Sequence, residues 1–280
     1  MAKIVAVHGI GMQREGEHSL KKFWLPALKD GLARAGRKLN RDKDLTCAFY
    51  GDLFRPKGKS AFLPPLDATD ITDPLEREML DAWWREAARI ESQVPGPQDA
   101  TKLWAPQTVQ RALNALSHSK FFAGLAERVL IFDLKQVVLY LNNSHIREEA
   151  QARVSEVVGP DTRVLIGHSL GSVIAYEAFC AHPEWPLKTF ITLGSPLGIR
   201  NIIFEKLRPA PQKSKGVWPG QAERWVNIAD RGDIVALEKQ LATCFGSRVN
   251  DQLISNGARA HDVTRYLTAK ETGDAIASGL

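Results

Sequence analysis

A serine flanked by two glycines stands past the middle of the chain, in the sequence Gly167-His168-Ser169-Leu170-Gly171. An apolar run at 164–166 precedes this motif and a helical apolar pattern over 170–181 follows it, which predicts a strand-to-helix turn. Glycines let strand and helix approach closely, and such a turn raises the serine hydroxyl above the sheet. The helix N-terminus also stabilises developing negative charge. The motif therefore predicts a nucleophilic Ser169, with a turn that carries no chemistry as the alternative.

A serine hydroxyl needs a general base, and the base needs a carboxylate to orient it. In folds with this kind of serine turn, the three residues occur along the chain in the order serine, acid, histidine. Of seven histidines, only His182 and His261 follow the motif and its adjacent His168. His182 ends the helix predicted after the motif, where a C-cap role is favoured. We therefore expect His261, in a loop before the last predicted helix, to be the base; an exposed loop histidine is the alternative.

The acid is expected after the apolar strand predicted at 224–229, where Asp230 and Asp233 both follow. Asp233 stands beyond Gly232 and precedes an apolar pair at 234–235. Aspartate also hydrogen-bonds nearby backbone N–H groups in turns. One of the two is therefore expected only to shape the turn, and the residues alone leave the choice open.

Acyl transfer also needs two backbone N–H groups directed at the oxyanion. The residue after the nucleophile, Leu170, is expected to supply one of them. The other is expected from a glycine-containing loop after an early strand, and His8-Gly9-Ile10-Gly11 fills that place. We assign the second donor to Ile10, with Gly11 as the alternative, and expect His8 to brace the loop. A plain tight turn is the other interpretation of this segment.

The elements that must position these residues alternate between strand and helix. Short apolar runs predict strands at 4–7, 45–50, 163–167, 188–193, 224–229 and 248–254. Helical periodicity predicts helices at 19–35, 74–93, 133–158, 170–181, 235–243 and 263–278. This order predicts an α/β fold, a mostly parallel sheet of about six strands with helices on both faces, in a single domain over 1–280.

The stretch at about 52–131 interrupts this alternation. Prolines punctuate it, and its aromatic residues include Trp83, Trp84, Trp104, Phe121 and Phe122. We predict a mostly helical insertion that forms a cap over the active site. The alternative is that these aromatic side chains only build a core.

Composition restricts the function further. The chain has 280 residues, 44% hydrophobic and 25% charged, which is ordinary for a globular protein. A net charge of +5 without a dense Lys/Arg run predicts no nucleic-acid partner. Three scattered cysteines are typical of a reducing compartment, and no signal peptide or membrane-spanning run stands out. We expect a soluble, cytoplasmic protein with no cofactor and no metal, and leave its oligomeric state open.

Three segments together resemble the α/β-hydrolase superfamily, in its lipase and esterase branch, which includes GPI-inositol-deacylase-like enzymes. They are Val7–Gly11, Gly167–Gly171 and Thr192–Pro196, which contains a Gly-Ser-Pro run. The resemblance extends over roughly 3–50 and 133–279. It implies the α/β-hydrolase fold, here as a minimal core without the first strands of the eight-stranded form. It also implies that the Gly-Ser-Pro run borders the acyl site.

This resemblance implies a serine hydrolase that cleaves an ester-type acyl bond in a small-molecule or lipid ester, through an acyl-enzyme intermediate. In that branch an aspartate followed closely by valine commonly supplies the acid, which favours Asp233. The implied triad is Ser169, Asp233 and His261. The alternatives are a peptidase or thioesterase with the same triad, and a non-catalytic binding module on the same fold.

Overall fold

The computed structural model describes residues 1–55, 65–97, 105–122 and 126–280. Six strands form one sheet in the order β2-β1-β3-β4-β5-β6, and every pairing between them is parallel. The strands are β1 (Ile4–Val7), β2 (Leu45–Ala48), β3 (Val164–His168), β4 (Thr189–Leu193), β5 (Arg224–Asp230) and β6 (Val249–Ile254). The predicted α/β architecture with about six parallel strands is confirmed, and each strand lies within two residues of its predicted bounds.

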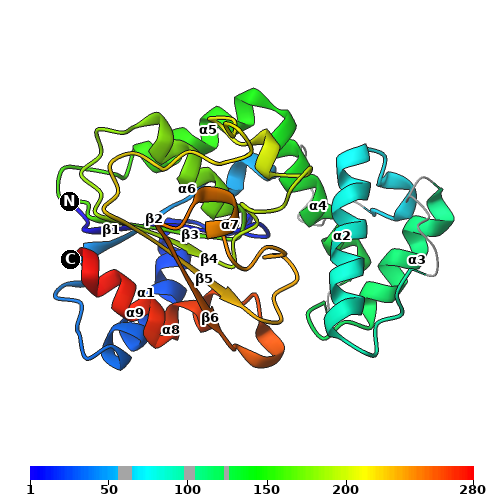
Figure 1. Ribbon diagram of the computed structural model, residues 1–280, viewed down its shortest axis with the longest axis horizontal. Coiled ribbons are helices and arrows are strands. Elements are labelled where there is room, and N and C mark those ends of the chain that lie inside the picture. The colour runs from blue at the N-terminus through cyan, green and yellow to red at the C-terminus, as the bar shows by residue number, and fades with distance from the viewer. Residues whose placement is uncertain (56–64, 98–104, 123–125) are drawn as a thin grey trace.

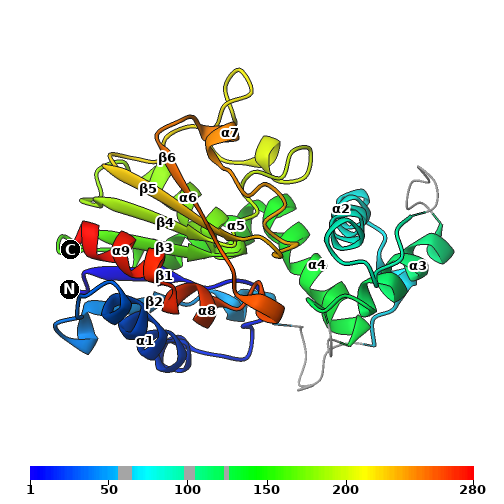
Figure 2. The same cartoon turned by 60° about the horizontal axis from the view of Figure 1, so that its bottom comes forward.

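Helices cover both faces of the sheet (Figure 1, Figure 2). On one face α1 (Glu17–Arg34), α8 (Val263–Thr268) and α9 (Lys270–Gly279) pack against side chains such as Ile4 and Ala6. On the other, α5 (Ser144–Ser155) and α6 (Leu170–Ala181) pack against Val5 and Val7. Because alternate residues of β1 enter the two cores, the strand must be apolar throughout, as its sequence is.

The part of 52–131 that the structure describes contains helices and no strand. It comprises α2 (Pro74–Ile90), α3 (Pro106–Ser117) and the start of α4 (Glu127–Asn142). In both views α2 and α3 lie beyond the carboxyl ends of the strands, and α4 leads back to the sheet (Figure 1, Figure 2). Trp83, Trp84 and Phe122 are buried and Phe121 is half-buried, whereas Trp104 lies outside the described residues.

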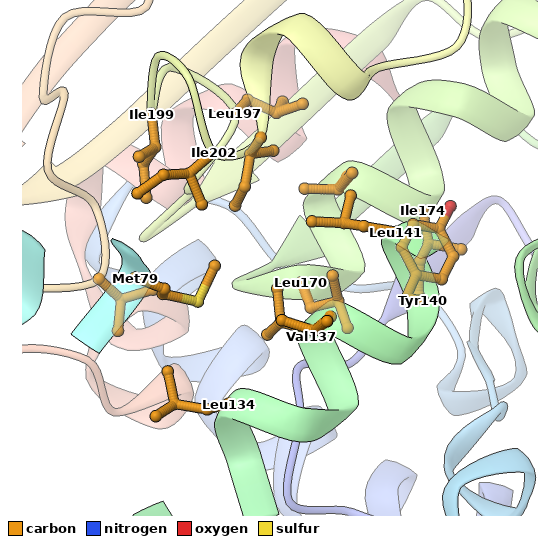
Figure 3. Close-up of a cluster of buried hydrophobic side chains, with 14 of the residues drawn as sticks. Met79, Leu134, Val137, Tyr140, Leu141, Leu170, Ile174, Leu197, Ile199 and Ile202 are labelled. Carbon is orange, nitrogen blue, oxygen red and sulfur yellow. The ribbon is translucent and has the colours of Figure 1, made fainter. Parts of the chain in front are cut away.

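An apolar cluster joins this helical insertion to the sheet domain (Figure 3). Met79 of α2 meets Val137 of α4 and Leu170 of α6, and all three side chains are almost fully buried. Ile199 and Ile202, from the loop after β4, close the cluster from the opposite side. Burying one such side chain stabilises a fold by roughly 1.5–3 kcal/mol, so this contact holds the insertion against the sheet domain.

Two helices that the sequence predicts as continuous are each broken at one residue. The predicted helix 133–158 is α4 followed by α5, because Asn143 adopts extended backbone and its side chain accepts the Ile146 N–H at 3.0 Å. The predicted helix 263–278 is α8 followed by α9, because Ala269 is extended, with ψ 142°. Local patterning does not resolve such one-residue breaks.

The helix predicted at 235–243 is wrong; only α7 (Ala242–Phe245) forms there. Side chains bind the backbone groups that a helix would have paired. Asp233 Oδ1 accepts the N–H groups of Val235 at 2.9 Å and Ala236 at 3.3 Å. The ammonium of Lys239 donates to the carbonyl oxygens of Asp233 and Ala236. Residues 233–239 are therefore held as a loop despite their apolar pattern.

A buried ion pair ties α5 to α6. The guanidinium of Arg147 donates to both carboxylate oxygens of Glu177, and the two side chains are 3% and 0% exposed. Tyr140 Oη also donates to Glu177 Oε2 at 2.6 Å, and Arg147 donates to the Lys206 carbonyl at 2.7 Å. The network joins α4, α5, α6 and the loop after β4, so each charge depends on the other for compensation.

We expect Glu177→Gln to lower the free energy of unfolding by about 3–5 kcal/mol, because it leaves a buried guanidinium without a counter-charge. Urea unfolding measures this effect. The matched control is Glu184→Gln, which removes an exposed carboxylate that lies 3.0 Å from His182 and should leave stability nearly unchanged. A Glu177→Gln protein as stable as its control would contradict the role given to the ion pair.

Candidate functional site

Ser169 occupies the turn between β3 and α6 in a strained conformation. Its φ is 52° and its ψ is −132°, a region that residues with a side chain rarely adopt. The turn is held because the Ser169 N–H donates to the Leu193 carbonyl at 3.0 Å. A Cβ at Gly171 would lie 2.1 Å from the His8 carbonyl oxygen, so only glycine lets α6 approach β1 this closely. The strain costs roughly 1–3 kcal/mol and persists because packed elements enforce it.

The structure brings His261 and Asp233 together at the ends of neighbouring elements. His261 Nδ1 lies 2.7 Å from Asp233 Oδ2, and the Tyr266 hydroxyl donates to the same oxygen at 2.7 Å. The Asp233 side chain is fully buried, whereas that of His261 is 20% exposed. Burial by itself raises the pKa of Asp233, but the His261 charge and these hydrogen bonds outweigh it and lower that pKa overall. Asp233 is therefore an ionised partner for the imidazole.

Asp230 does not contact His261; it shapes the turn after β5. Its Oδ1 accepts the Gly232 N–H at 2.6 Å, and its Oδ2 accepts the Asn256 N–H. Burial raises the pKa of Asp230, and its main-chain hydrogen bonds oppose that rise. Of the two carboxylates that the sequence left open, the one bonded to the imidazole is Asp233.

His168 holds the backbone of His261 in place. Its Nε2 lies 2.9 Å from the His261 carbonyl oxygen, so Nε2 carries the proton and donates it. Burial, and then the nearby charge of His261, lower the pKa of His168 to about 3, which keeps it neutral. His168 is therefore a neutral, buried imidazole whose Nε2–H is already used, and its role is to position His261.

The loop after β1 lies against the serine. A Cβ at Gly9 would lie 2.9 Å from the Ser169 Cβ, which measures how closely the loop approaches. The Gly11 N–H donates to Gln136 Oε1 at 3.4 Å. Within the described part of the chain, neither the Ile10 N–H nor the Leu170 N–H has an acceptor. Both N–H groups are therefore available to an acceptor from outside the chain, whereas the Gly11 N–H is already engaged.

His8 braces this loop. Its Nε2 accepts the Tyr50 N–H at 3.2 Å, so its Nδ1 carries the proton and donates to the Gly9 carbonyl at 2.6 Å. The Tyr50 ring stacks on the imidazole with centroids 4.0 Å apart. Burial lowers the pKa of His8 to about 4, so the ring stays neutral and keeps this bonding pattern near pH 7.

Two adjoining cavities meet at the serine and the histidine. Ser169 borders a narrow apolar pocket whose walls include Met79, Leu170 and Pro196. His261 lines a larger cavity of about 510 Å³, within the size range of small-molecule sites. Ile10, Trp83 and Val235 line both, so the cavities are neighbours. Ser169 Oγ has no hydrogen-bond partner among the residues that the structure describes, and in unliganded sites such bonds often tighten only around substrate.

A second carboxyl group, Asp133, lines the larger cavity. Its Oδ1 accepts from Gln136 Nε2 at 3.1 Å, and the same Gln136 holds the Gly11 N–H. Burial raises the pKa of Asp133 to about 7, although the charge of His261 and the Gln136 hydrogen bond both lower it. The cavity therefore contains a carboxyl group that changes protonation near neutral pH.

Several of these residues carry no local signal in the sequence. Tyr266, Gln136 and Asp133 look like ordinary polar positions on helices, and only the fold brings them to the site. Gly194 could be found from the sequence, because it belongs to the Gly-Ser-Pro run that follows β4. A Cβ there would lie 2.7 Å from Asp233 Oδ2, so the strand end must pass close to the His261–Asp233 pair.

No protein-family model matches the chain, and no curated protein matches it. Among the described residues, no helix is both long and apolar enough to span a membrane. The same residues contain no group of three or more His, Cys, Asp or Glu side chains arranged to hold a metal ion.

We expect Asp133→Asn to stabilise the protein at pH 8 and to have no such effect near pH 4. The folded-state pKa of Asp133, about 7, lies above its ordinary value, so ionisation is disfavoured in the folded state. The neutral carboxyl favours folding below pH 4, and this contribution is lost as the pH rises toward 7. The difference in thermal midpoint between variant and wild type should therefore grow from pH 4 to pH 8.

The measurement is a thermal scan at each pH. Glu127→Gln removes a carboxylate from the start of the same helix and controls for the change in net charge. A pH-independent difference for Asp133→Asn would contradict the raised pKa.

Proposed function

We propose that the chain is a serine hydrolase with the α/β-hydrolase fold that cleaves an ester-type acyl bond. One observation carries the proposal. A serine with positive φ stands at a strand-to-helix turn, and a hydrogen-bonded histidine–aspartate pair lies across an adjoining cavity. This combination provides a nucleophile, a base and an orienting carboxylate in the chain order serine, acid, histidine. The resemblance of the three sequence segments to the lipase and esterase branch supports the same assignment.

In this proposal Ser169 Oγ attacks the carbonyl carbon of the ester while His261 Nε2 takes the hydroxyl proton. Asp233 Oδ2 holds the imidazole through Nδ1, fixes its tautomer and stabilises the imidazolium. Tyr266 donates to the same oxygen and keeps the carboxylate aimed at the ring. His168 holds the backbone of His261, so the imidazole is constrained at both its side chain and its main chain.

The Ile10 and Leu170 N–H groups are the proposed oxyanion donors. The carbonyl oxygen becomes negatively charged when the C–O bond to Ser169 forms, and two fixed donors stabilise that charge without reorganising. The imidazolium then gives its proton to the leaving alkoxide as the ester C–O bond breaks. Water, activated by the same imidazole, attacks the acyl-enzyme and releases the acid and the free serine.

The sizes of the two cavities limit where the acyl group and the leaving group of an ester can lie. The narrow pocket beside Ser169 is lined by apolar side chains from α2, α4 and the loop after β4, but its volume of about 10 Å³ leaves room only for a group the size of one water. The larger cavity has a mostly apolar lining with a few polar groups such as Asp133 and His168, so we propose that it takes most of the substrate. Because Trp83 of α2 lines both cavities, we propose that the insertion at 52–131 acts as a cap.

A fluorophosphonate probe tests the proposal directly. We expect it to label the wild-type protein and not Ser169→Ala, and we expect ester turnover to fall by a factor on the order of 10⁶. Ser117→Ala, which removes an exposed hydroxyl on α3, serves as the control and should retain labelling. Labelling of Ser169→Ala at the wild-type rate, or no labelling of the wild type, would overturn the proposal and favour a non-catalytic binding module.

A substrate panel separates the remaining alternatives. Ester, thioester and amide substrates that share one acyl group differ only in the leaving group, which neither fold nor triad sets. We expect kcat/KM to be highest for the ester. A clear preference for the amide or the thioester would reassign the enzyme to peptidases or thioesterases and would leave Ser169 as the nucleophile.

The two aspartates after β5 give a second, independent prediction. Asp233→Asn should lower kcat by about 10⁴, because an amide cannot hold the imidazole in the required tautomer. The fold should be largely retained, since the amide oxygen still accepts the Val235 and Ala236 N–H groups. Asp230→Asn should keep its activity and lose roughly 1 kcal/mol of stability when a local hydrogen bond weakens.

The measurements are kcat and the thermal midpoint of both variants. The reverse pattern, an inactive Asp230→Asn and an active Asp233→Asn, would show that the pair seen in the structure is not the one used in catalysis.

A further inference from the structure

A third cavity, of about 730 Å³, opens behind the segment that carries His261. It lies where the end of β6 and the loop after it meet α8, the start of α9 and the end of α1, on the sheet face that these three helices cover (Figure 2). Arg259 lines this groove and also the cavity of the proposed active site. The groove is therefore separate from the serine but shares one wall with the cavity of His261.

The groove is strongly cationic. Its lining contains five cationic side chains and one carboxylate, Glu271, which leaves an excess of four positive charges. The cations come from separate segments of the chain and converge only in the fold. They are Arg34, Arg231, Arg259, Arg265 and Lys270.

Neighbouring carboxylates compensate two of these cations. Arg259 pairs with Asp262 at 3.6 Å and Lys270 pairs with Asp274 at 2.6 Å. Arg34, Arg231 and Arg265 form no ion pair with any residue that the structure describes. Like charges held around one cavity repel each other, so an anion that enters it relieves this repulsion and stabilises the folded chain.

Backbone groups add to the positive electrostatic potential of the groove. The ten-residue helix α9 begins at the groove, and no side chain caps its start. Ala269, Lys270 and Glu271 at its start line the groove, so the positive end of its dipole lies beside the groove. Ser255, which also lines it, provides a hydroxyl group. Planar guanidinium groups together with a helix N-terminus match phosphate oxygens better than they match a single carboxylate.

We propose that this groove binds a small molecule that carries two or more phosphate groups, held by Arg34, Arg231 and Arg265. With Asp262 and Asp274 counted, the excess falls to about two positive charges. What favours a diphosphate over a single phosphate is the number of donors, since three unpaired guanidinium groups can each bind phosphate oxygens through two N–H groups. The volume fits a small ligand, since sites of 300–1,000 Å³ are usual for such molecules. This site uses none of the groups proposed to act on an ester.

Isothermal titration calorimetry with inorganic pyrophosphate, at low ionic strength, tests the proposal. We expect saturable 1:1 binding that weakens as salt is added, and inorganic phosphate should bind about 10-fold more weakly or worse. The double variant Arg231→Ala/Arg265→Ala should weaken pyrophosphate binding by about 10-fold for each arginine lost. Arg231→Lys/Arg265→Lys keeps the charges and should recover part of the affinity.

The control is Lys22→Ala/Arg128→Ala, which removes two exposed cations outside the groove and should bind as the wild type does. Vesicles of phosphatidylcholine with a phosphoinositide identify the source of the phosphate. Binding to the vesicles and not to pyrophosphate, lost in the groove variant, assigns a lipid headgroup; binding to pyrophosphate alone assigns a free phosphate compound. No binding of either probe, or an equal loss in control and groove variants, overturns the proposal. The readout is binding, so it is independent of the result with fluorophosphonate.

Discussion

The rest of the site depends on one strained turn, the residue at φ 52° between β3 and α6. A serine does not adopt this conformation by preference, so its surroundings must enforce it. β3 lies between β1 and β4 in the sheet, and α6 is buried along nearly its whole length. Gly171 lets that helix pack directly on the backbone of His8. Because both flanking elements are fixed, the turn cannot relax, and the hydroxyl stays at the carboxyl edge of the sheet.

A fully buried carboxylate organises the other half of the site. Asp233 Oδ1 binds two N–H groups of its own loop, while Oδ2 binds His261 and Tyr266. All of its acceptor capacity is thus used, which keeps the group ionised despite complete burial. The same bonds prevent the helix that the apolar pattern of 235–243 predicts. Local propensity fails there because hydrogen bonds to the Asp233 and Lys239 side chains satisfy the backbone instead.

The sequence was sufficient to predict the sheet but not every helix end. Strands of a parallel sheet are apolar on both faces, so each stands out as a short apolar run. The break at Ala269 depends on a distant contact, since a Cβ at Gly31 of α1 would lie 2.1 Å from the Leu267 carbonyl oxygen. The serine, the two aspartates and His261 could be selected from spacing and chain order. Tyr266 and His168 could not be, because their roles exist only through hydrogen bonds between distant segments.

Among the residues that the structure describes, the Lys239 ammonium group links the insertion to Asp233. Lys239 donates to the Asp233 and Ala236 carbonyl oxygens, and its Nζ lies 3.7 Å from Glu86 of α2. Burial lowers the pKa of Lys239, whereas the Asp233 and Glu86 charges oppose that change. Phe121 also approaches the His261 ring, with centroids 5.7 Å apart. The insertion therefore contacts both the loop that holds Asp233 and the His261 ring, in addition to lining the cavity.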